Sequence, residues 1–191
     1  MRRSSAWLAV VAGLAVIAYI TLNTVRTEGP GSRGVPAGER MPPFAVLLAR
    51  SDRQCDGRPC DAALSCDVRG RDVLNVCDLE RRGPVALAFV AEGEDECREQ
   101  IDVLERVKPR HPGVQFAAIA IRGDRDELVR TIRERRWTLP VGYDHDGAVA
   151  NSYAVAVCPT ITFAERGGVV RETSIGLLGE AELTRRLERL G

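Results

Sequence analysis

The chain has 191 residues, enough for one domain with short appendages, and its hydrophobic content of 45% is that of a globular rather than a disordered protein. Its 27 basic and 27 acidic residues give a formal net charge of zero, which argues against a nucleic-acid-binding surface. The six cysteines are many for a cytosolic domain of this size, so the composition favours an oxidising compartment.

The N-terminal segment is long and apolar. Residues 6–22 (AWLAVVAGLAVIAYITL) contain no charged side chain. Extension of this run to residue 25 gives a helix of roughly 30 Å, the thickness of the hydrocarbon core of a bilayer. We therefore expect residues 6–25 to be a transmembrane anchor that contacts the lipid bilayer. A cleaved signal peptide is the alternative, although no small-residue cleavage pattern follows the apolar run.

The charges around this segment predict its orientation. Arg2 and Arg3 favour a cytoplasmic N-terminus, so the rest of the chain would lie outside the cytoplasm. The segment after the anchor is rich in Gly and Pro, which predicts a flexible linker. We expect a cytoplasmic N-terminus at 1–5, the anchor at 6–25, the linker at 26–43, a Cys-rich extension at 44–82 and the main domain at 83–191.

Strand and helix patterns alternate in the main domain. Residues 85–91 (VALAFVA) are a continuous apolar run, which predicts a buried strand. Residues 96–110 follow, with an inward stripe at three- and four-residue spacing that predicts a helix: Cys97, Ile101, Leu104 and Lys108. The later elements are strand 114–121, helix 124–135, strand 139–143, helix 148–153, strands 160–164 and 169–175 around a turn at 166–168, and helix 179–190. This order predicts an α/β fold with a mixed central sheet flanked by helices, because strand–helix–strand units pair in parallel and the closing hairpin is antiparallel.

Three local patterns carry a family resemblance. A strand ends in Phe89-Val90-Ala91 and the next helix starts near Cys97-Arg98. Val157-Cys158-Pro159-Thr160 precedes a strand, and Asp144-x-x-Gly147 leads to Tyr153-x-Val155. Together, over residues 85–190, they resemble membrane-anchored thioredoxin-like proteins of the redoxin type, which implies a thioredoxin-like fold.

One departure from that family concerns the attacking cysteine. The family starts its helix with Trp-Cys-x-x-Cys-Arg. On alignment at Phe89, the tryptophan falls on Gly93, the first cysteine on Glu94 and the second on Cys97. Thiol–disulfide exchange requires a thiolate, which a carboxylate cannot replace. The resemblance also implies a cis proline at Pro159, which would bring Cys158 against the start of the helix and close to Cys97.

The candidate catalytic residues are therefore Cys97, Cys158, Pro159 and Glu94. Cys97 and Cys158 would form the redox pair, and Pro159 would shape the substrate groove. Cys97 could instead be a buried core cysteine, an independent redox thiol or the thiol of a peroxiredoxin-type peroxidase. Asp144-His145-Asp146 is expected to be a solvated turn, and we expect no metal and no cofactor.

The extension holds the other four cysteines: Cys55, Cys60, Cys66 and Cys77. Two structural disulfides are favoured, with Cys66 facing Cys77 across a hairpin and Cys55 left for Cys60. Free thiols and a zinc site are alternatives, although paired C-x₂-C motifs are absent.

Two functions follow from the sequence. The favoured one is a membrane-anchored thiol-disulfide oxidoreductase that acts on exported proteins with cysteines or on a membrane redox partner, with an atypical active site. The other is a non-catalytic thioredoxin-fold binding module whose disulfides are structural. Glu94 favours the second function, whereas the cysteine beside the expected cis proline favours the first.

Overall fold

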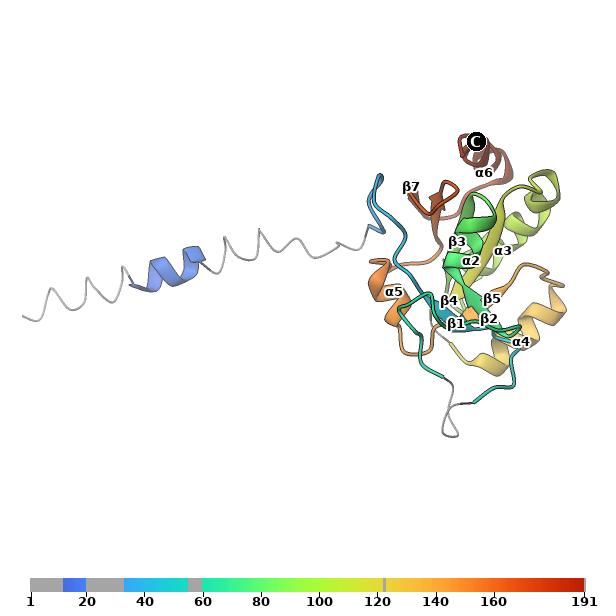
Figure 1. Ribbon diagram of the computed structural model, residues 1–191, viewed down its shortest axis with the longest axis horizontal. Helices are drawn as coiled ribbons and strands as arrows, with labels where there is room; N and C mark the ends of the chain where they lie inside the picture. Colours follow the sequence, from blue (N-terminus) through green and yellow to red (C-terminus); the bar gives the residue numbers. More distant parts are fainter. Residues whose placement is uncertain (1–11, 20–32, 55–59, 122, 191) are drawn as a thin grey trace, which may run out of the picture. The chain divides into compact units, whose positions relative to one another are not determined.

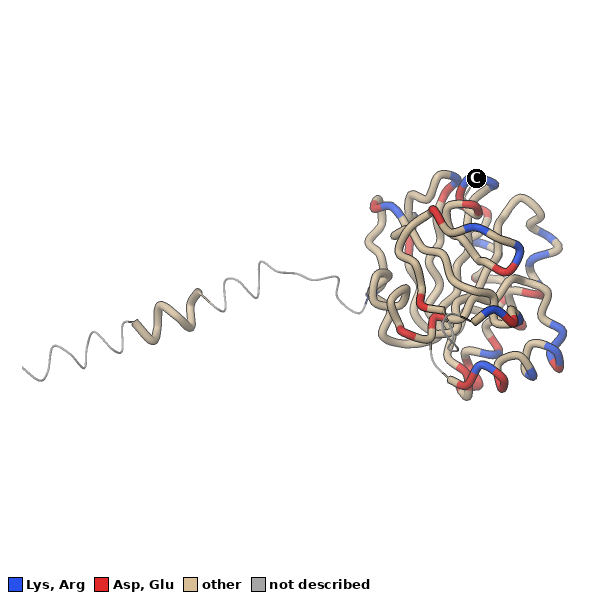
Figure 2. The backbone as a smooth tube through the Cα atoms, turned by 60° about the horizontal axis from the view of Figure 1, so that its bottom comes forward, with Lys and Arg blue, Asp and Glu red and all other residues tan. Residues whose placement is uncertain are grey.

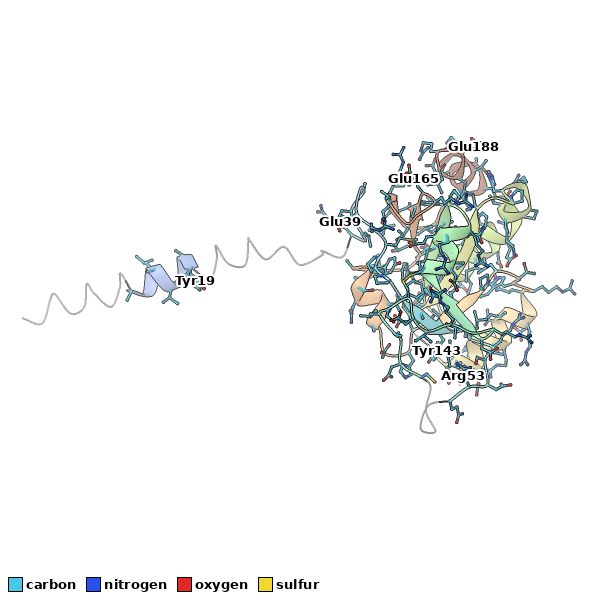
Figure 3. The ribbon with its side chains drawn as sticks, viewed as in Figure 1. Tyr19, Glu39, Arg53, Tyr143, Glu165 and Glu188 are labelled. Atoms are coloured by element: carbon cyan, nitrogen blue, oxygen red, sulfur yellow. A yellow bond between two sulfur atoms is a disulfide. The ribbon has the colours of Figure 1, made fainter. Side chains whose placement is uncertain are left out.

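A computed structural model describes residues 12–19, 33–54, 60–121 and 123–190. The chain divides into two units, residues 1–31 and Ser32–Gly191. In the first unit, residues 12–19 are helical, and Tyr19 projects from this helix with its side chain 71% exposed (Figure 3). No helix within the described residues is both long enough and apolar enough to cross a membrane.

The second unit is built on a five-stranded mixed sheet in the order β5-β4-β3-β6-β7 (Figure 1). Strand β3 pairs in parallel with β4, and β4 with β5, whereas β3–β6 and β6–β7 are antiparallel. The strands are β3 (Val85–Val90), β4 (Gln115–Ala120), β5 (Val141–Tyr143), β6 (Thr160–Ala164) and β7 (Val170–Ile175). The expected mixed α/β fold is therefore confirmed.

Helices cover both faces of this sheet because the central strands are apolar on both sides. They are α2 (Val76–Arg82), α3 (Asp95–Val107), α4 (Arg125–Glu134), α5 (Ala148–Ser152) and α6 (Glu180–Glu188). In β3, Ala86 and Ala88 belong to the core cluster that contains residues of α3, α4 and α6. Leu87 and Phe89 belong to the opposite cluster, which contains residues of α2 and α5. Figure 1 shows α3 and α5 on opposite sides of β3.

The end of α3 differs from the expected helix at 96–110. The α-helix stops at Val107, and a 3₁₀ turn, η1 (Lys108–Arg110), follows. Pro109 has no backbone N–H, so it cannot continue the α-helical ladder. Lys108, expected on the inward stripe, is partly exposed there, and Val107 is the buried residue instead.

The Cys-rich extension contains secondary structure that the sequence patterns did not predict. Strands β1 (Ala45–Leu47) and β2 (Val73–Asn75) form an antiparallel pair, and α2 follows β2 directly. An isolated bridge between Leu48 and Gly142 attaches this pair to β5 at the edge of the main sheet. A side chain at position 142 would meet Val46 at 2.4 Å, so the close approach requires glycine. The extension therefore belongs to the same compact unit as the main domain.

The expected flexible linker at 26–43 is wrong from Gly34 onward. Gly34 N–H donates to Ala154 O at 3.2 Å, and Met41 N–H donates to Gly168 O at 2.8 Å. Val35 and Met41 are buried in the cluster beneath α2 and α5. Burial of these two apolar side chains adds roughly 2 kcal/mol each to the backbone hydrogen bonds that hold this segment on the domain. Residues 26–32 lie outside the described part of the chain.

Basic and acidic residues are interspersed along the second unit (Figure 2). Many pair with each other, as in the contacts of Arg186 and Arg189 with Glu172, both at 2.9 Å. Exposed pairs of this kind contribute about 0–1 kcal/mol each, so the apolar core rather than surface charge stabilises the fold.

Candidate active site

The candidate site begins where β3 ends. The chain leaves the strand at Ala91, turns at Gly93 with φ +88°, and enters α3 through Glu94, whose backbone is extended at φ −100° and ψ 119°. Glu94 is the N-cap residue, but its side chain accepts no capping hydrogen bond. Cys97 is therefore the third residue of the helix, and its side chain turns into the core with an exposure of 1%.

The second part of the site precedes β6. The Cys158–Pro159 peptide bond is cis, as the resemblance implied. Pro159 O accepts a hydrogen bond from Gly176 N at 2.8 Å, and the Thr160 hydroxyl donates to Val157 O at 2.8 Å. These bonds hold the short segment that carries Cys158 against the start of β6.

Cys97 and Cys158 are joined by a disulfide, with Cα atoms 5.8 Å apart and a sequence separation of 61. This distance lies in the usual range for disulfides. The pair expected from the sequence is thus in bonding contact. The catalytic roles assigned to Cys97, Cys158, Pro159 and Glu94 remain predictions.

An open groove of about 560 Å³ lies beside this bond. Its walls come from the end of β3, from α5 and from the segment before the cis proline. The lining residues are Ala91, Glu92, Glu94, Ile121, Gly147, Ala150, Asn151, Val155, Ala156, Val157 and Cys158. Cys158 is partly exposed and lines the groove, whereas Cys97 does not line it.

A carboxylate that the sequence analysis missed also lines the groove. The Glu92 side chain is only 3% exposed, and its Oε1 lies 3.5 Å from Nη1 of Arg98. The same oxygen accepts a hydrogen bond from the Thr131 hydroxyl of α4 at 3.0 Å. Gly123 packs so closely that a Cβ there would lie 2.4 Å from Cβ of Glu92. An acidic residue directly after a buried strand was the signal that could have identified it.

Arg98 is the basic partner of the acidic first turn of α3. Its pKa is raised above the usual value, first by the hydrogen bond to Asp95 and then by the charges of Asp95 and Glu92, against an opposing effect of burial. The guanidinium therefore stays positive. It is shared between Glu92 and Asp95, so it does not neutralise Glu94 and Glu96 as well.

The wall formed by α5 depends on Asp144. The expected solvated turn is wrong for this residue, because Asp144 is 1% exposed. Its carboxylate accepts hydrogen bonds from Val149 N at 3.2 Å and Ala150 N at 2.8 Å, which satisfies free N–H groups at the start of α5. Burial raises its pKa, and these two backbone hydrogen bonds oppose that effect.

His145 and Asp146 are exposed, as expected of a turn, and Asp61 lies beside them. The ligand atoms of these three residues lie within 4.8 Å of one another. However, Nε2 of His145 faces Asp61 at 3.4 Å, while Nδ1 faces Asp146 at 4.0 Å. The two carboxylates therefore approach different ring nitrogens of His145, and the absence of a metal stays a prediction.

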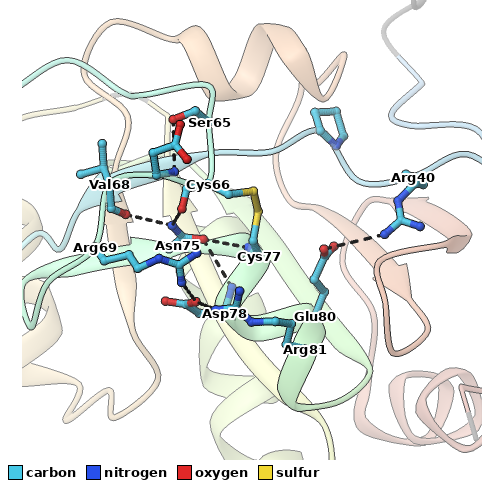
Figure 4. The surroundings of a disulfide bond; sticks show 12 residues. Arg40, Ser65, Cys66, Val68, Arg69, Asn75, Cys77, Asp78, Glu80 and Arg81 are labelled. Carbon is cyan, nitrogen blue, oxygen red and sulfur yellow. Dashed lines mark hydrogen bonds and ion pairs between the residues drawn. A yellow bond between two sulfur atoms is a disulfide. The ribbon is translucent and has the colours of Figure 1, made fainter.

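The remaining cysteines are in the extension. Cys66 and Cys77 form a disulfide with Cα atoms 5.8 Å apart, so neither is a zinc ligand (Figure 4). Cys60 is also disulfide-bonded, and Cys55 lies outside the described residues. Neither Cys66 nor Cys77 lines the groove beside Cys158.

Asn75 connects this disulfide to the backbone around it (Figure 4). Its amide donates to Cys66 O at 3.1 Å and to Val68 O at 2.9 Å. Its carbonyl accepts from Cys77 N at 2.9 Å and Asp78 N at 3.3 Å, which caps α2. One buried side chain therefore organises both ends of the disulfide-bonded loop.

The strand order, the cis proline and the cysteine at the start of α3 define a protein of thioredoxin-like fold. No family model matches the chain. It is 27% identical over 143 residues to the thiol-disulfide oxidoreductase ResA of Oceanobacillus iheyensis, a match that covers 71% of this chain and 74% of that protein.

Solved structures give the same result. The structure of DsbF from Mycobacterium tuberculosis matches with 25% identity and a TM-score of 0.58, over 62% of this chain and 88% of that one. A putative thiol:disulfide interchange protein DsbE of Chlorobium tepidum matches with 18% identity and a TM-score of 0.65, over 82% of this chain and 99% of that one. The chain belongs to the thioredoxin-like superfamily, which includes thiol-disulfide oxidoreductases.

Proposed function

We propose that the protein is a thiol-disulfide oxidoreductase whose exchanging bond is Cys97–Cys158. The observation that carries this proposal is the position of the bond, which joins the first turn of α3 to the residue before the cis proline. One of its cysteines lines an open groove, so a thiolate of another protein has access to the bond. Glu94 stands where the family has its attacking cysteine, so this pair replaces the usual C-x-x-C pair.

The proposed reaction transfers one disulfide. A cysteine pair on a partner protein is oxidised, the Cys97–Cys158 bond is reduced to two thiols, and two electrons and two protons pass to this chain. The reverse reaction reduces a partner disulfide. The bond to Cys158 and the 1% exposure of Cys97 do not favour a peroxidase, which needs an accessible thiol at that position.

We also propose that residues 6–25 are retained as a membrane anchor and that the compact unit lies outside the cytoplasm, where its partners are exported proteins with cysteines or a membrane redox partner. The apolar run and Arg2-Arg3 support the orientation. Two disulfides within the described residues favour an oxidising compartment.

A stoichiometric exchange experiment tests the redox function. The oxidised full-length chain, in detergent, is mixed with a reduced, unfolded secreted protein, and disulfide formation in that protein is followed. Wild type should transfer close to one disulfide per chain, as should Cys66→Ala/Cys77→Ala if it remains folded, whereas Cys97→Ala/Cys158→Ala should transfer none. No transfer by wild type would favour the binding module with structural disulfides, whereas equal transfer by wild type and Cys97→Ala/Cys158→Ala would place the exchanging bond at another cysteine pair.

A further inference from the structure

The two sulfurs of the Cys97–Cys158 bond differ in access. Cys97 is 1% exposed and packs in the core with Ile101 and Leu104 of the same helix. Cys158 is partly exposed, and its neighbour Val157 is 48% exposed at the rim of the groove. Which sulfur a thiolate attacks depends on access. An incoming thiolate in the groove therefore meets Cys158 first.

The sulfur that leaves also differs between the two directions of attack. Attack at Cys158 releases Cys97 as a thiolate in the first turn of α3, a helix of 13 residues. A helix N-terminus stabilises a thiolate, although the acidic residues of this turn oppose the effect. Attack at Cys97 would release Cys158, which lies in no helix. Access therefore decides the direction, because the burial of Cys97 and the acidic first turn oppose the effect of the helix N-terminus.

We propose that Cys158, not Cys97, forms the mixed disulfide with the partner protein. This inference rests on the proposed function. The partner thiolate bonds to Sγ of Cys158, the bond between the two cysteines breaks, and the electron pair leaves on Cys97, which takes up a proton. A second partner thiolate then attacks the partner's own sulfur and releases Cys158, which takes up the second proton. The partner ends with a disulfide and this chain with two thiols.

This direction moves the partner-facing sulfur to a different position from the one that the family resemblance implies. In the family, the first cysteine at the helix start is the one that reacts with the partner, and Glu94 occupies that position here. The cysteine before the cis proline takes over the partner-facing role, and Cys97 keeps the buried role of the second cysteine.

The charge of the groove supports a second inference, about the partner. Glu92 and Glu94 are the charged groups that line it, and the described lining residues include no basic side chain. Arg98, which is not among the lining residues, is shared between Glu92 and Asp95. Arg122, next to the lining residue Ile121, lies outside the described residues. We infer that the partner segment carries Lys or Arg next to its cysteine, because charge complementarity steers association.

Wild-type protein tests the first inference without any substitution. The oxidised full-length chain is mixed with excess reduced glutathione, quenched in acid within the first turnover, and mapped by mass spectrometry. The glutathione adduct should lie on Cys158 at least tenfold more often than on Cys97. An adduct mainly on Cys97 would overturn this inference alone, and no adduct on either cysteine would overturn the proposed function with it.

Single-cysteine variants provide the matched comparison. Cys97→Ser leaves Cys158 as the free thiol, and Cys158→Ser leaves Cys97. With glutathione disulfide as the probe, Cys97→Ser should form a mixed disulfide at least tenfold faster than Cys158→Ser. The opposite order would contradict the inference, and circular dichroism of both variants checks that they are folded.

Two probe peptides test the charge preference: one has Arg on both sides of a cysteine, and the other has Glu. Each rate of exchange with the oxidised chain is divided by that peptide's rate with a neutral small disulfide, which cancels the intrinsic reactivity of its thiol. The normalised ratio should favour the Arg peptide by about tenfold at low salt and decline as salt is added. Glu94→Gln should lower the ratio, whereas Glu99→Gln, an exposed residue of α3 outside the groove lining, should not. A ratio of one or less in wild type would overturn the second inference.

Discussion

The stability contribution of the Cys97–Cys158 bond can be worked out from its position in the chain. Replacement of both cysteines by alanine opens a loop with a sequence separation of 61. Loop-closure entropy in the unfolded chain then predicts a loss of about 4 kcal/mol in the free energy of unfolding. The same relation predicts about 3 kcal/mol for Cys66→Ala/Cys77→Ala, whose separation is 11. Loss of the buried sulfur of Cys97 adds about 1 kcal/mol to the first value.

Urea unfolding of the compact unit that starts at Ser32, under non-reducing conditions, measures both losses. The reasoning predicts that the Cys97–Cys158 variant loses more than the Cys66–Cys77 variant, with the slope of free energy against urea raised in both because their unfolded states are less compact. A loss below about 1 kcal/mol for Cys97→Ala/Cys158→Ala, or the reverse order of the two variants, would refute it.

The same coupling affects the reduction potential. If folding and the disulfide stabilise each other by about 4 kcal/mol, the folded pair is about 90 mV more reducing than the same pair in an unfolded chain, since about 30 mV corresponds to 1.4 kcal/mol for two electrons. The long loop therefore lowers the reduction potential of the Cys97–Cys158 pair and makes the reduced pair a stronger reductant. The Cys97–Cys158 bond can therefore stabilise the folded domain and still exchange with thiols of a partner protein.

Three further predictions concern the anchor, the missing cysteine and the extension. The full-length chain should stay in the membrane fraction after a high-salt wash and be digested by protease from outside; release as a soluble protein starting near residue 24 would contradict the anchor. Wild type should reduce insulin disulfides poorly. Glu94→Cys combined with Cys158→Ser should gain this activity, because positions 94 and 97 then form a C-x-x-C pair. Thioredoxin-like turnover by wild type would show that Glu94 does not stand at the position of the family's nucleophile. Asn75→Ala should lower the free energy of unfolding by about 3 kcal/mol, because it removes the α2 cap and two hydrogen bonds donated to backbone carbonyls. Asn75→Asp keeps the acceptor oxygens but not the amide donors, so it should lower the free energy of unfolding by about 2 kcal/mol. Equal losses for both variants in urea unfolding would argue against the donor contacts.

Much of the main sheet could be predicted because its strands are long apolar runs. Thr160–Ala164 has the expected bounds, β3 is one residue shorter than expected at its end, and β4 is one residue shorter at each end. Their burial on both faces removes ambiguity about which side is inward. The ends of the helices were harder to predict. The α-helix α3 ends at Val107, and a 3₁₀ turn that contains Pro109 takes the place of the expected last α-helical turn.

The extension could not be predicted in the same way. β1 and β2 have three residues each, too few to show a periodic pattern, and their pairing depends on contact with β5 rather than on local sequence. Asp144 was misjudged for a related reason. Its Asp-His-Asp-Gly pattern is typical of an exposed turn, and only the tertiary structure shows that the carboxylate points to the N–H groups of α5.

At the candidate site, the sequence predicted the pairing but not its surroundings. Pro159 and the helical position of Cys97 were enough to bring the two cysteines together. Glu92 was missed because its role depends on Arg98 and on Thr131 of α4, 39 residues away in sequence. Its place directly after a buried strand was a local signal, but the contact with Thr131 of α4 has no signature in the sequence.

The central claim is that Cys97–Cys158 is an exchanging bond and not a structural one. A redox titration of the oxidised full-length chain, with each cysteine mapped by mass spectrometry, tests it most directly. We predict that Cys97 and Cys158 become free together at a potential within the range of thiol-disulfide oxidoreductases, about −120 to −270 mV, while Cys66 and Cys77 stay bonded. A Cys97–Cys158 bond that stays closed below about −300 mV would contradict the account and identify the domain as a binding module with structural disulfides.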